Sequence, residues 1–120
     1  MNEVSPSGEV LSAGRLEIRP GYYSARVEGR PLALTVRELE LLTALARRPD
    51  RIVSREELYA VVWRKPFPKG DRSVDVYVAK LRTKLERELP GLRYIHTHFG
   101  FGYRFSPQPL HLLHKHSTGR

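Results

Sequence analysis

The clearest periodic pattern in the chain lies between residues 71 and 89. Five aliphatic residues recur there at i, i+4, i+7, i+11 and i+15, the spacing of one side of an α-helix. They are Val74, Val78, Leu81, Leu85 and Leu89. The opposite side is basic, with small or methyl-bearing residues at its centre: Arg72, Val76, Ala79, Lys80, Thr83 and Arg87. Tyr77, Arg82 and Lys84 lie on the flanks. The pattern predicts a helix that packs on a core and offers a cationic face to a polyanion; the alternative is a solvated face without a partner.

Shorter alternating segments precede this helix between residues 14 and 34. Apolar residues alternate with polar ones in three pieces, at Leu16 and Ile18, at Tyr23, Ala25 and Val27, and at Leu32 and Leu34. Turn-forming residues separate the pieces, first Pro20-Gly21 and then the segment 28–31. The pattern predicts a small antiparallel sheet with one buried face.

Two capping-box patterns mark the starts of two further helices. Thr35 is followed by Glu38, and Ser54 by Glu57, the spacing at which both side chains accept from free N–H groups. The buried side of the first helix is predicted to comprise Leu39, Leu41, Leu42, Leu45 and Ala46. The buried side of the second is predicted to comprise Leu58, Val61 and Val62, with Trp63 at its end. Ile52-Val53 is predicted to be a short extended link between them.

The remaining segments complete a recognisable order of elements. Residues 64–70 contain two prolines and a glycine and are predicted to be loop. After the long helix, two alternating segments at 94–98 and 101–105 flank Gly100 and predict a hairpin. A small sheet, three helices and a hairpin define an α+β winged helix-turn-helix. The predicted organisation is a flexible arm or linker at 1–13, the domain at 14–106 and a flexible tail at 107–120.

Charge is distributed unevenly along the 120 residues, and the formal net charge is +8. Residues 1–60 hold nine Lys/Arg and nine Asp/Glu, whereas residues 61–120 hold twelve and four, so the second half carries the whole excess. An excess of positive charge in one half of a chain favours binding to nucleic acid. Binding to a membrane surface fits less well, because the apolar face of the basic helix is aliphatic and suits packing on a core. The chain has no cysteine and therefore no disulfide or thiolate metal site.

Several segments resemble a known family. RSVDVYVAKLRTKLE, HTHFGFGYRF and LTVRELELLTALARRPDRIVSREEL are similar to the C-terminal effector domain of OmpR/PhoB-type response regulators. The resemblance implies a four-stranded N-terminal sheet, three helices and a wing that bind promoter DNA sequence-specifically. It also implies a bacterial two-component phosphorelay and a cytoplasmic location at the nucleoid.

The resemblance assigns DNA-contacting roles to particular positions. It places recognition-helix contacts at Val76, Tyr77, Ala79, Lys80 and Arg82, a phosphate contact at Arg72 and a wing contact at Thr97. By chemistry, Lys80 suits guanine, Val76 suits a thymine methyl, and Arg82, Lys84 and Arg87 suit phosphates. The predicted DNA-binding residues are Arg72, Val76, Tyr77, Ala79, Lys80, Arg82, Thr83, Lys84, Arg87, Thr97, His98 and Phe99.

Alternatives and departures from the family pattern accompany this assignment. Arg72 could instead pair with Asp75, Tyr77 could pack against the hairpin, and Arg104 is as consistent with a structural role as with DNA. Phe99 stands where the family commonly has a wing-tip arginine, so minor-groove recognition by arginine is in doubt. Ala79 replaces an arginine of some members, which implies fewer base contacts.

The sequence offers no chemistry typical of an enzyme. It has no glycine-rich phosphate loop and no nucleophile beside a base, and no cofactor is predicted. His96 and His98 lie on the same face of a predicted strand, but the pattern places no third metal ligand beside them. We therefore expect both to be wing side chains near DNA. Residues 1–13 could not form a receiver domain; a cut-out effector domain, a standalone regulator and the end of a larger protein all remain open. Predicted partners are double-stranded DNA, RNA polymerase through residues 64–70, and a head-to-tail second copy; the alternative function is a protein-interaction module.

Overall fold

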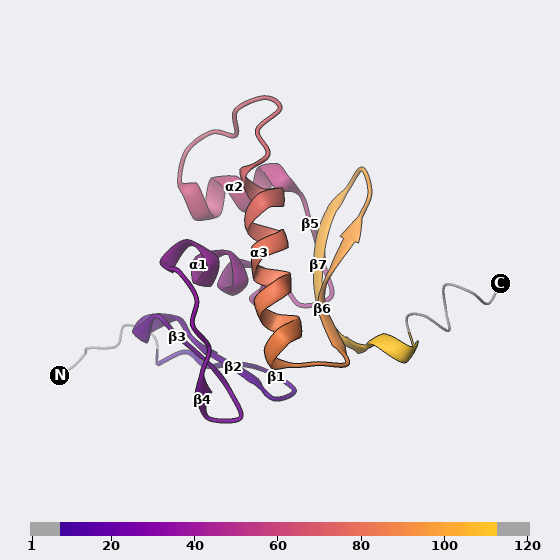
Figure 1. Ribbon diagram of the computed structural model, residues 1–120. Helices are drawn as coiled ribbons and strands as arrows, with labels where there is room; N and C mark the ends of the chain where they lie inside the picture. Colours follow the sequence, from indigo (N-terminus) through magenta and orange to yellow (C-terminus); the bar gives the residue numbers. More distant parts are fainter. Residues whose placement is uncertain (1–7, 113–120) are drawn as a thin grey trace.

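Two antiparallel sheets enclose three helices in the part of the chain that the structure, a computed structural model, describes, residues 8–112 (Figure 1). The N-terminal sheet consists of β1 (Leu11–Ala13), β2 (Leu16–Arg19), β3 (Ser24–Val27) and β4 (Arg30–Pro31), with the 3₁₀ turn η1 (Pro20–Tyr22) between β2 and β3. The helices are α1 (Val36–Ala46), α2 (Arg55–Trp63) and α3 (Ser73–Glu88). The second sheet combines β5 (Ile52–Val53), β6 (Leu92–His98) and β7 (Gly102–Pro109) in the order β5-β7-β6.

The N-terminal sheet is antiparallel, as predicted, but it begins earlier than expected. Leu11 pairs with Ile18, so residues 11–13 form a strand although they were assigned to a flexible arm. Tyr23 was predicted on the buried face and this is wrong: it has φ 48° at the end of η1, and its side chain is exposed. The chain reverses at η1, and the strand starts one residue later, at Ser24. Residues 1–7 of the predicted arm lie outside the described residues.

The helix starts follow the predicted caps, with one exception. At α1, Thr35 and Glu38 form the reciprocal capping box. At α2, Ser54 accepts from the Glu57 backbone N–H, but the Glu57 carboxylate pairs with Arg51 and Arg48 and does not return to the cap. The reciprocal half of the second box is therefore wrong, because two arginines compete for the carboxylate. Val61, predicted to be buried, is 42% exposed at the outer side of α2.

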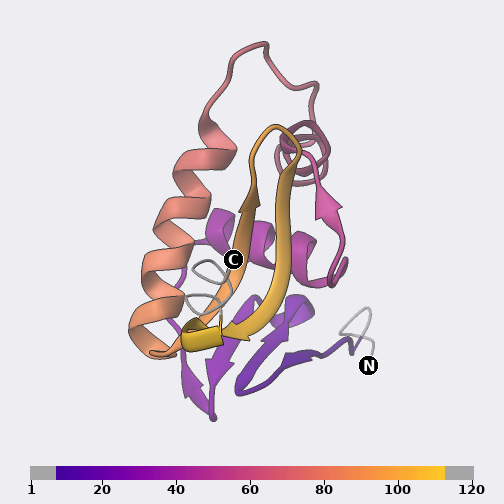
Figure 2. The ribbon, with the colours of Figure 1, turned by 90° about the vertical axis from the view of Figure 1, so that its right-hand side faces the viewer.

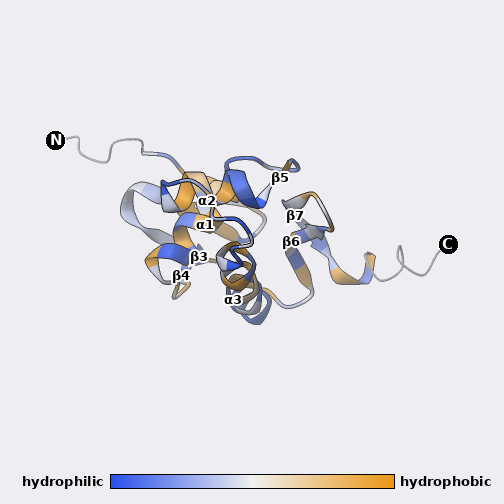
Figure 3. Ribbon diagram, turned by 90° about the horizontal axis from the view of Figure 1, so that it is seen from above, coloured by the Kyte–Doolittle hydropathy of each residue, from blue (hydrophilic) through white to orange (hydrophobic). Residues whose placement is uncertain are grey.

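Helix α3 is placed as its hydrophobic periodicity predicts. Its five aliphatic residues, Val74 through Leu89, are at most 2% exposed and join the core under α1 and β6. Seen from above, its ribbon carries hydrophobic and hydrophilic stretches on different sides (Figure 3). The helix begins at Ser73, after Arg72 as N-cap, and Asp71 accepts a hydrogen bond from the Ser73 N–H. No helix of the described residues has the length and apolarity that a membrane crossing requires.

The closing hairpin of β6 and β7 lies alongside α3, with β5 at its other edge (Figure 2). The predicted extended link Ile52-Val53 is thus a strand of this sheet. Strand β7 continues to Pro109, three residues beyond the predicted domain end, and Leu92 pairs with Pro109. The part of the predicted tail at 113–120 lies outside the described residues. The hairpin and α3 together form one face on which the predicted site residues can be compared.

Candidate nucleic-acid interface

One exposed stripe runs the length of α3, opposite its buried side. The residues of this α3 stripe are all exposed: Arg72, Val76, Ala79, Lys80, Thr83 and Arg87. Val76, an aliphatic residue at the centre of the stripe, is 49% exposed. The small side chain of Ala79, beside Lys80, projects little from the helix. The stripe therefore offers three cations, spread along the helix, around a short apolar patch. A helix of this kind fits a major groove, which is wide enough to admit one α-helix.

Tyr77 connects the α3 stripe to α2. Its ring makes an edge-to-face contact with Trp63, with 5.7 Å between ring centroids, and the Lys80 ammonium lies 5.1 Å from the Tyr77 ring. The alternative of packing against the hairpin is therefore wrong, because the aromatic partner comes from α2. This contact orients Lys80 without covering it, since Lys80 remains exposed.

Arg82, predicted to contact phosphate, is turned toward the hairpin. Its Nε donates to the Ile95 carbonyl at 3.0 Å, its Nη2 donates to Thr97 Oγ1, and its guanidinium lies 5.7 Å from the Tyr103 ring. Burial lowers the pKa of Arg82, although an arginine stays charged at neutral pH. Arg82 fastens α3 to β6 through two of the five donors of its guanidinium.

Lys84, the other flanking cation, is also paired internally. Its Nζ lies 2.7 Å from Oε1 of Glu38, a side chain that is only 2% exposed. Burial alone would raise the pKa of Glu38, but hydrogen bonds from Lys84 and Thr35 outweigh burial and lower it. Lys84 neutralises a buried carboxylate in α1, so its positive charge is paired within the protein.

Short polar side chains on this face are likewise engaged with the protein. Thr83 Oγ1 donates to the Ala79 carbonyl, and Thr97 accepts from Arg82. Arg104 Nε donates to His98 Nε2 at 3.0 Å, and its Nη1 lies 3.7 Å from Asp50. Arg104 thus makes contacts within the hairpin and to the turn before β5, which fits the structural alternative.

Asp75 gathers three donors where α2, α3 and the hairpin meet. Arg55 and Arg72 each donate to its Oδ2 at 2.9 Å, and the Tyr103 hydroxyl donates to Oδ1. Burial would raise the pKa of Asp75, but the hydrogen bonds from Tyr103, Arg72 and Arg55 lower it. Burial, together with the bond to Asp75, raises the pKa of Tyr103 to about 12. The alternative that Arg72 pairs with Asp75 is therefore confirmed.

Arg55 and Asp75 were missed as interface residues. Arg55 lies in the segment that was explained by helix capping alone, yet its exposed guanidinium stands beside that of Arg72 on the same carboxylate. The only signal in the sequence was the position of Arg55 directly after the Ser54 cap. Arg55 is the first residue of α2, and its guanidinium reaches Asp75 near the start of α3.

We expect the Asp75 contacts to make the domain less stable in acid. The folded-state pKa is lowered, so the stabilisation is complete above the unfolded pKa, which lies near 4, and is lost as the pH falls through the folded value. Urea unfolding between pH 7 and pH 3 should show this loss, and the Asp75→Asn variant should show a shallower dependence on pH. An equal dependence in both proteins would contradict the role of this carboxylate.

The tip of the hairpin exposes two aromatic rings. Phe99 is 89% exposed and Phe101 is 74% exposed, on either side of Gly100. They share a surface hollow with Arg55, Arg72 and Tyr103, so the tip adjoins the start of α3. The wing and the α3 stripe are therefore parts of one surface.

The two histidines of β6 bond to different partners within the hairpin. His96 was expected near DNA, but it is buried, with Nε2 2.7 Å from the Ser106 carbonyl oxygen, and burial lowers its pKa. Among residues 8–112 no group of three or more His, Asp or Glu side chains could hold a metal ion.

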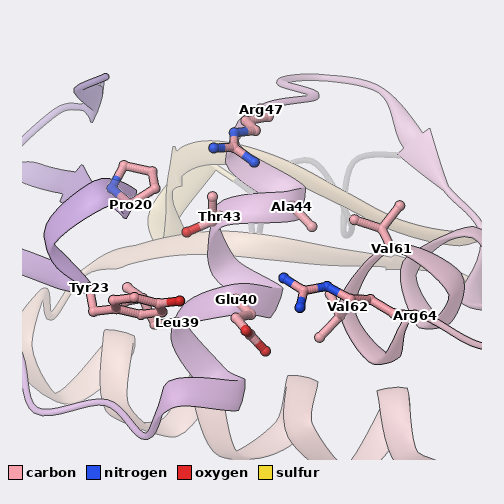
Figure 4. A pocket seen from close by; sticks show the side chains of 10 residues that line it. All are labelled: Pro20, Tyr23, Leu39, Glu40, Thr43, Ala44, Arg47, Val61, Val62 and Arg64. Atoms are coloured by element: carbon pink, nitrogen blue, oxygen red, sulfur yellow. The ribbon is translucent and has the colours of Figure 1, made fainter. Parts of the chain in front are cut away.

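A different hollow lies between η1, α1 and α2 (Figure 4). Tyr23, Arg47 and Arg64 are among the residues that line it. Nη2 of Arg47 lies 2.6 Å from Oε1 of Glu9. Residues of the α3 stripe are not among those that line it. The predicted site and this hollow are therefore separate surfaces.

The fold and this surface define a winged helix-turn-helix protein with a cationic, exposed third helix. A family model described as "Transcriptional regulatory protein, C terminal" matches residues 29–105. The chain therefore belongs to this family, the C-terminal effector domains of OmpR/PhoB-type response regulators. The fold expected from the sequence is thereby confirmed.

Curated relatives cover most of this chain. The DNA-binding response regulator MtrA of Mycolicibacterium smegmatis is 36% identical over 106 residues, which are 88% of this chain and 46% of MtrA. The transcriptional regulatory protein CseB of Streptomyces avermitilis is 39% identical over 100 residues, which are 83% of this chain and 40% of CseB. The chain thus spans less than half the length of these relatives.

Solved structures of isolated domains agree more completely in length. The DNA-binding domain of CpxR from E. coli has a TM-score of 0.75 and 33% identity, covering 82% of this chain and 96% of that one. The Klebsiella pneumoniae RstA DNA-binding domain, in complex with the RstA box, has a TM-score of 0.72 and 31% identity, covering 83% and 99%. This chain therefore corresponds to one effector domain.

Proposed function

We propose that this domain binds duplex DNA sequence-specifically and thereby regulates transcription, with α3 in the major groove and the wing on the adjacent backbone. The observation that carries the proposal is the separation of the two sides of α3. Its aliphatic side is buried to 2% exposure or less, while Arg72, Lys80 and Arg87 are all exposed on the other. Three exposed cations along one side of a helix suit a row of phosphates and base edges, and the Arg72 side chain stays 74% exposed although it also pairs with Asp75.

The contacts within the domain divide the predicted DNA-binding residues into two groups. Val76, Ala79 and Lys80 lie exposed at the middle of α3, where base edges are reached, with Lys80 suited to guanine and Val76 to a thymine methyl. Arg72 and Arg87, near the two ends, suit phosphates. We assign Arg82 and Lys84 to holding α3 in place, because both are bonded to other elements of the domain.

The test of this function begins with selection of bound sequences from random duplex DNA. Binding to the selected site is then titrated against salt, and the logarithm of affinity should fall by about 0.9 per phosphate contact for each unit of log salt. Enrichment of a defined sequence with a steep slope supports the proposal. A flat salt response, or no binding to any duplex, would instead favour a protein-interaction module that shares the fold.

Lys80→Ala and Arg87→Ala should differ in kind. Loss of Lys80 should reduce the binding free energy for the selected site by about 1–3 kcal/mol. It should also weaken the sequence preference at one base pair, because contacts to base edges determine specificity. Loss of Arg87 should weaken all sequences alike and lower the salt slope by about 0.9, because phosphate contacts do not carry sequence information. Affinity measurements on a panel of single base-pair changes separate the two. If both variants lose affinity equally for every sequence, the assignment of Lys80 is wrong.

The same proposal extends to partners. The exposed loop at 64–70, which carries Arg64, Lys65 and Lys69, suits an acidic surface such as one on RNA polymerase. Two copies bound head-to-tail on repeats about one helical turn apart fit a wing that extends to one side of α3. We also propose that the effector domain is not an enzyme and that it acts at the bacterial nucleoid in the cytoplasm, which is supported by its similarity to transcriptional regulatory proteins of bacteria.

A further inference from the structure

The wing ends in a turn that holds Phe99 at its apex. The Phe101 N–H donates to the His98 carbonyl at 2.8 Å, so residues 98–101 form a closed four-residue turn. Gly100 has φ +83° at the third position of this turn, a conformation that glycine adopts without strain. The second position, occupied by Phe99, is the one that projects furthest, and its ring is 89% exposed. With Phe101, which is 74% exposed, it gives the wing tip two large apolar rings that are open to a partner.

The surroundings of Phe99 indicate which partner it has. The hollow beside the ring is lined by Arg55 and Arg72 at the starts of α2 and α3, and also by Glu56 and Asp75. Both guanidinium groups pair with Asp75 and remain partly exposed. Arg72 is also the first residue of the α3 stripe, so the wing tip continues the surface proposed to bind DNA. An apolar ring that continues a cationic helix face suits the DNA minor groove, whose walls are phosphates and sugars and whose floor is stacked bases. An apolar surface of a second protein would leave both arginines facing it.

We propose that the Phe99 ring inserts as an apolar wedge into the minor groove beside the site occupied by α3, partly unstacking one base step and bending the duplex. Phe101 supports this wedge from the other side of Gly100. The inference rests on the proposed function and adds to it a mode of recognition by DNA deformation. Inserted apolar side chains of this kind bend DNA toward the major groove.

Insertion of a ring has consequences that differ from those of a wing-tip cation. It neutralises no phosphate, so it adds affinity that does not depend on salt. It favours a flexible pyrimidine–purine step, TA or CA/TG, at the point of entry, because such steps unstack most easily. Sequence preference should therefore extend to base pairs outside the reach of α3.

The experiment compares Phe99→Ala with the wild type on the selected duplex, labelled at both ends for energy transfer and carrying 2-aminopurine at the flanking step. Tyr22→Ala, a similarly exposed aromatic residue on η1, is the matched control. Because Phe99 is exposed, its loss should leave stability nearly unchanged. We expect Phe99→Ala to lower DNA affinity about tenfold with the same salt slope, as expected for loss of one stacked ring. It should also reduce the DNA bend measured by energy transfer. The increase in 2-aminopurine fluorescence that reports unstacking should be abolished.

A second variant, Phe99→Arg, separates insertion from ordinary phosphate contact. It should regain affinity with a salt slope steeper by about 0.9, but without the 2-aminopurine signal. Salt-dependent binding with an unchanged bend and fluorescence in Phe99→Ala would overturn the inference and leave the proposed function intact. Loss of a second bound copy in Phe99→Ala, with no change in bend, would also overturn it by identifying a protein contact. Absence of duplex binding by the wild type would overturn both.

Discussion

Replacing Lys84 by methionine is expected to destabilise the domain by about 3–5 kcal/mol, the usual cost of removing one partner of a buried ion pair. Methionine keeps most of the length of the side chain but leaves the Glu38 carboxylate, which is 2% exposed, with the hydrogen bond from the Thr35 backbone N–H. Since small domains are stable by about 5–15 kcal/mol, much of the total would be lost. Urea unfolding at pH 7 measures the difference.

Lys80→Met is the matched control, since it removes the same charge one turn earlier on α3. Lys80 is exposed and its ammonium lies against the Tyr77 ring, so the stability of this variant should change by less than about 0.5 kcal/mol while its DNA affinity falls. The double variant Glu38→Gln/Lys84→Met should recover most of the loss, because no charge is then buried alone. Equal stability of Lys80→Met and Lys84→Met would contradict the structural role of Lys84.

Gly102→Ala is expected to cost about 3 kcal/mol of stability and to displace the wing. A Cβ at this position would lie 2.1 Å from the Val53 carbonyl oxygen, and the φ of +144° is one that alanine rarely adopts. The substitution combines backbone strain with overpacking, each worth about 1–3 kcal/mol. It would push β7 away from β5 and carry Phe99 with it. Thermal unfolding and the affinity for the selected duplex should both decline.

Gly100→Ala is the control for this effect within the same hairpin. Gly100 also has a positive φ, +83°, but a Cβ there would meet nothing within 4 Å. Its cost should therefore be limited to backbone strain of about 1 kcal/mol. If both glycine variants lost the same stability, the close approach of β7 to β5 would not be the cause.

Periodicity predicted the orientation of α3 because the position of a Cβ around a helix depends only on sequence spacing. The buried residues from Val74 to Leu89 and the exposed α3 stripe both follow from it. The same argument cannot place the ends of long side chains. Arg82 and Lys84 lie at the edge of the predicted basic face, yet they bend toward Ile95 and Glu38, which are 13 and 46 residues away in the sequence.

Similar competition explains the other differences. Glu57 was assigned to a cap, but Arg48 and Arg51 reach its carboxylate from the preceding turn. Tyr23 alternates correctly with Ala25 and Val27, yet η1 reverses the chain just before it and turns the ring outward. Arg55 was overlooked because its partner, Asp75, belongs to a helix 20 residues later. In each case the deciding contact comes from another element and has no local signature.

Two groups of residues have different roles on the side of the domain proposed to face DNA. The α3 stripe provides the cations and the low apolar patch for the major groove. The internal bonds of Arg82, Lys84 and Asp75 hold α3 in a fixed relation to α1, α2 and the hairpin, so that the stripe and the wing approach one duplex together. Fixing these groups before binding reduces the ordering cost of association.

The central claim is that phosphates meet the α3 side of the domain, and a comparison of salt slopes tests it most directly. Arg72→Ala/Arg87→Ala removes two charges from the α3 stripe, and Arg15→Ala/Arg26→Ala removes two exposed charges from the β1–β2 turn and from β3. Both variants have the same net charge. We expect the slope of log affinity against log salt to fall by about 1.8 in the first variant and to stay unchanged in the second. Equal slopes in the two variants would contradict the claim.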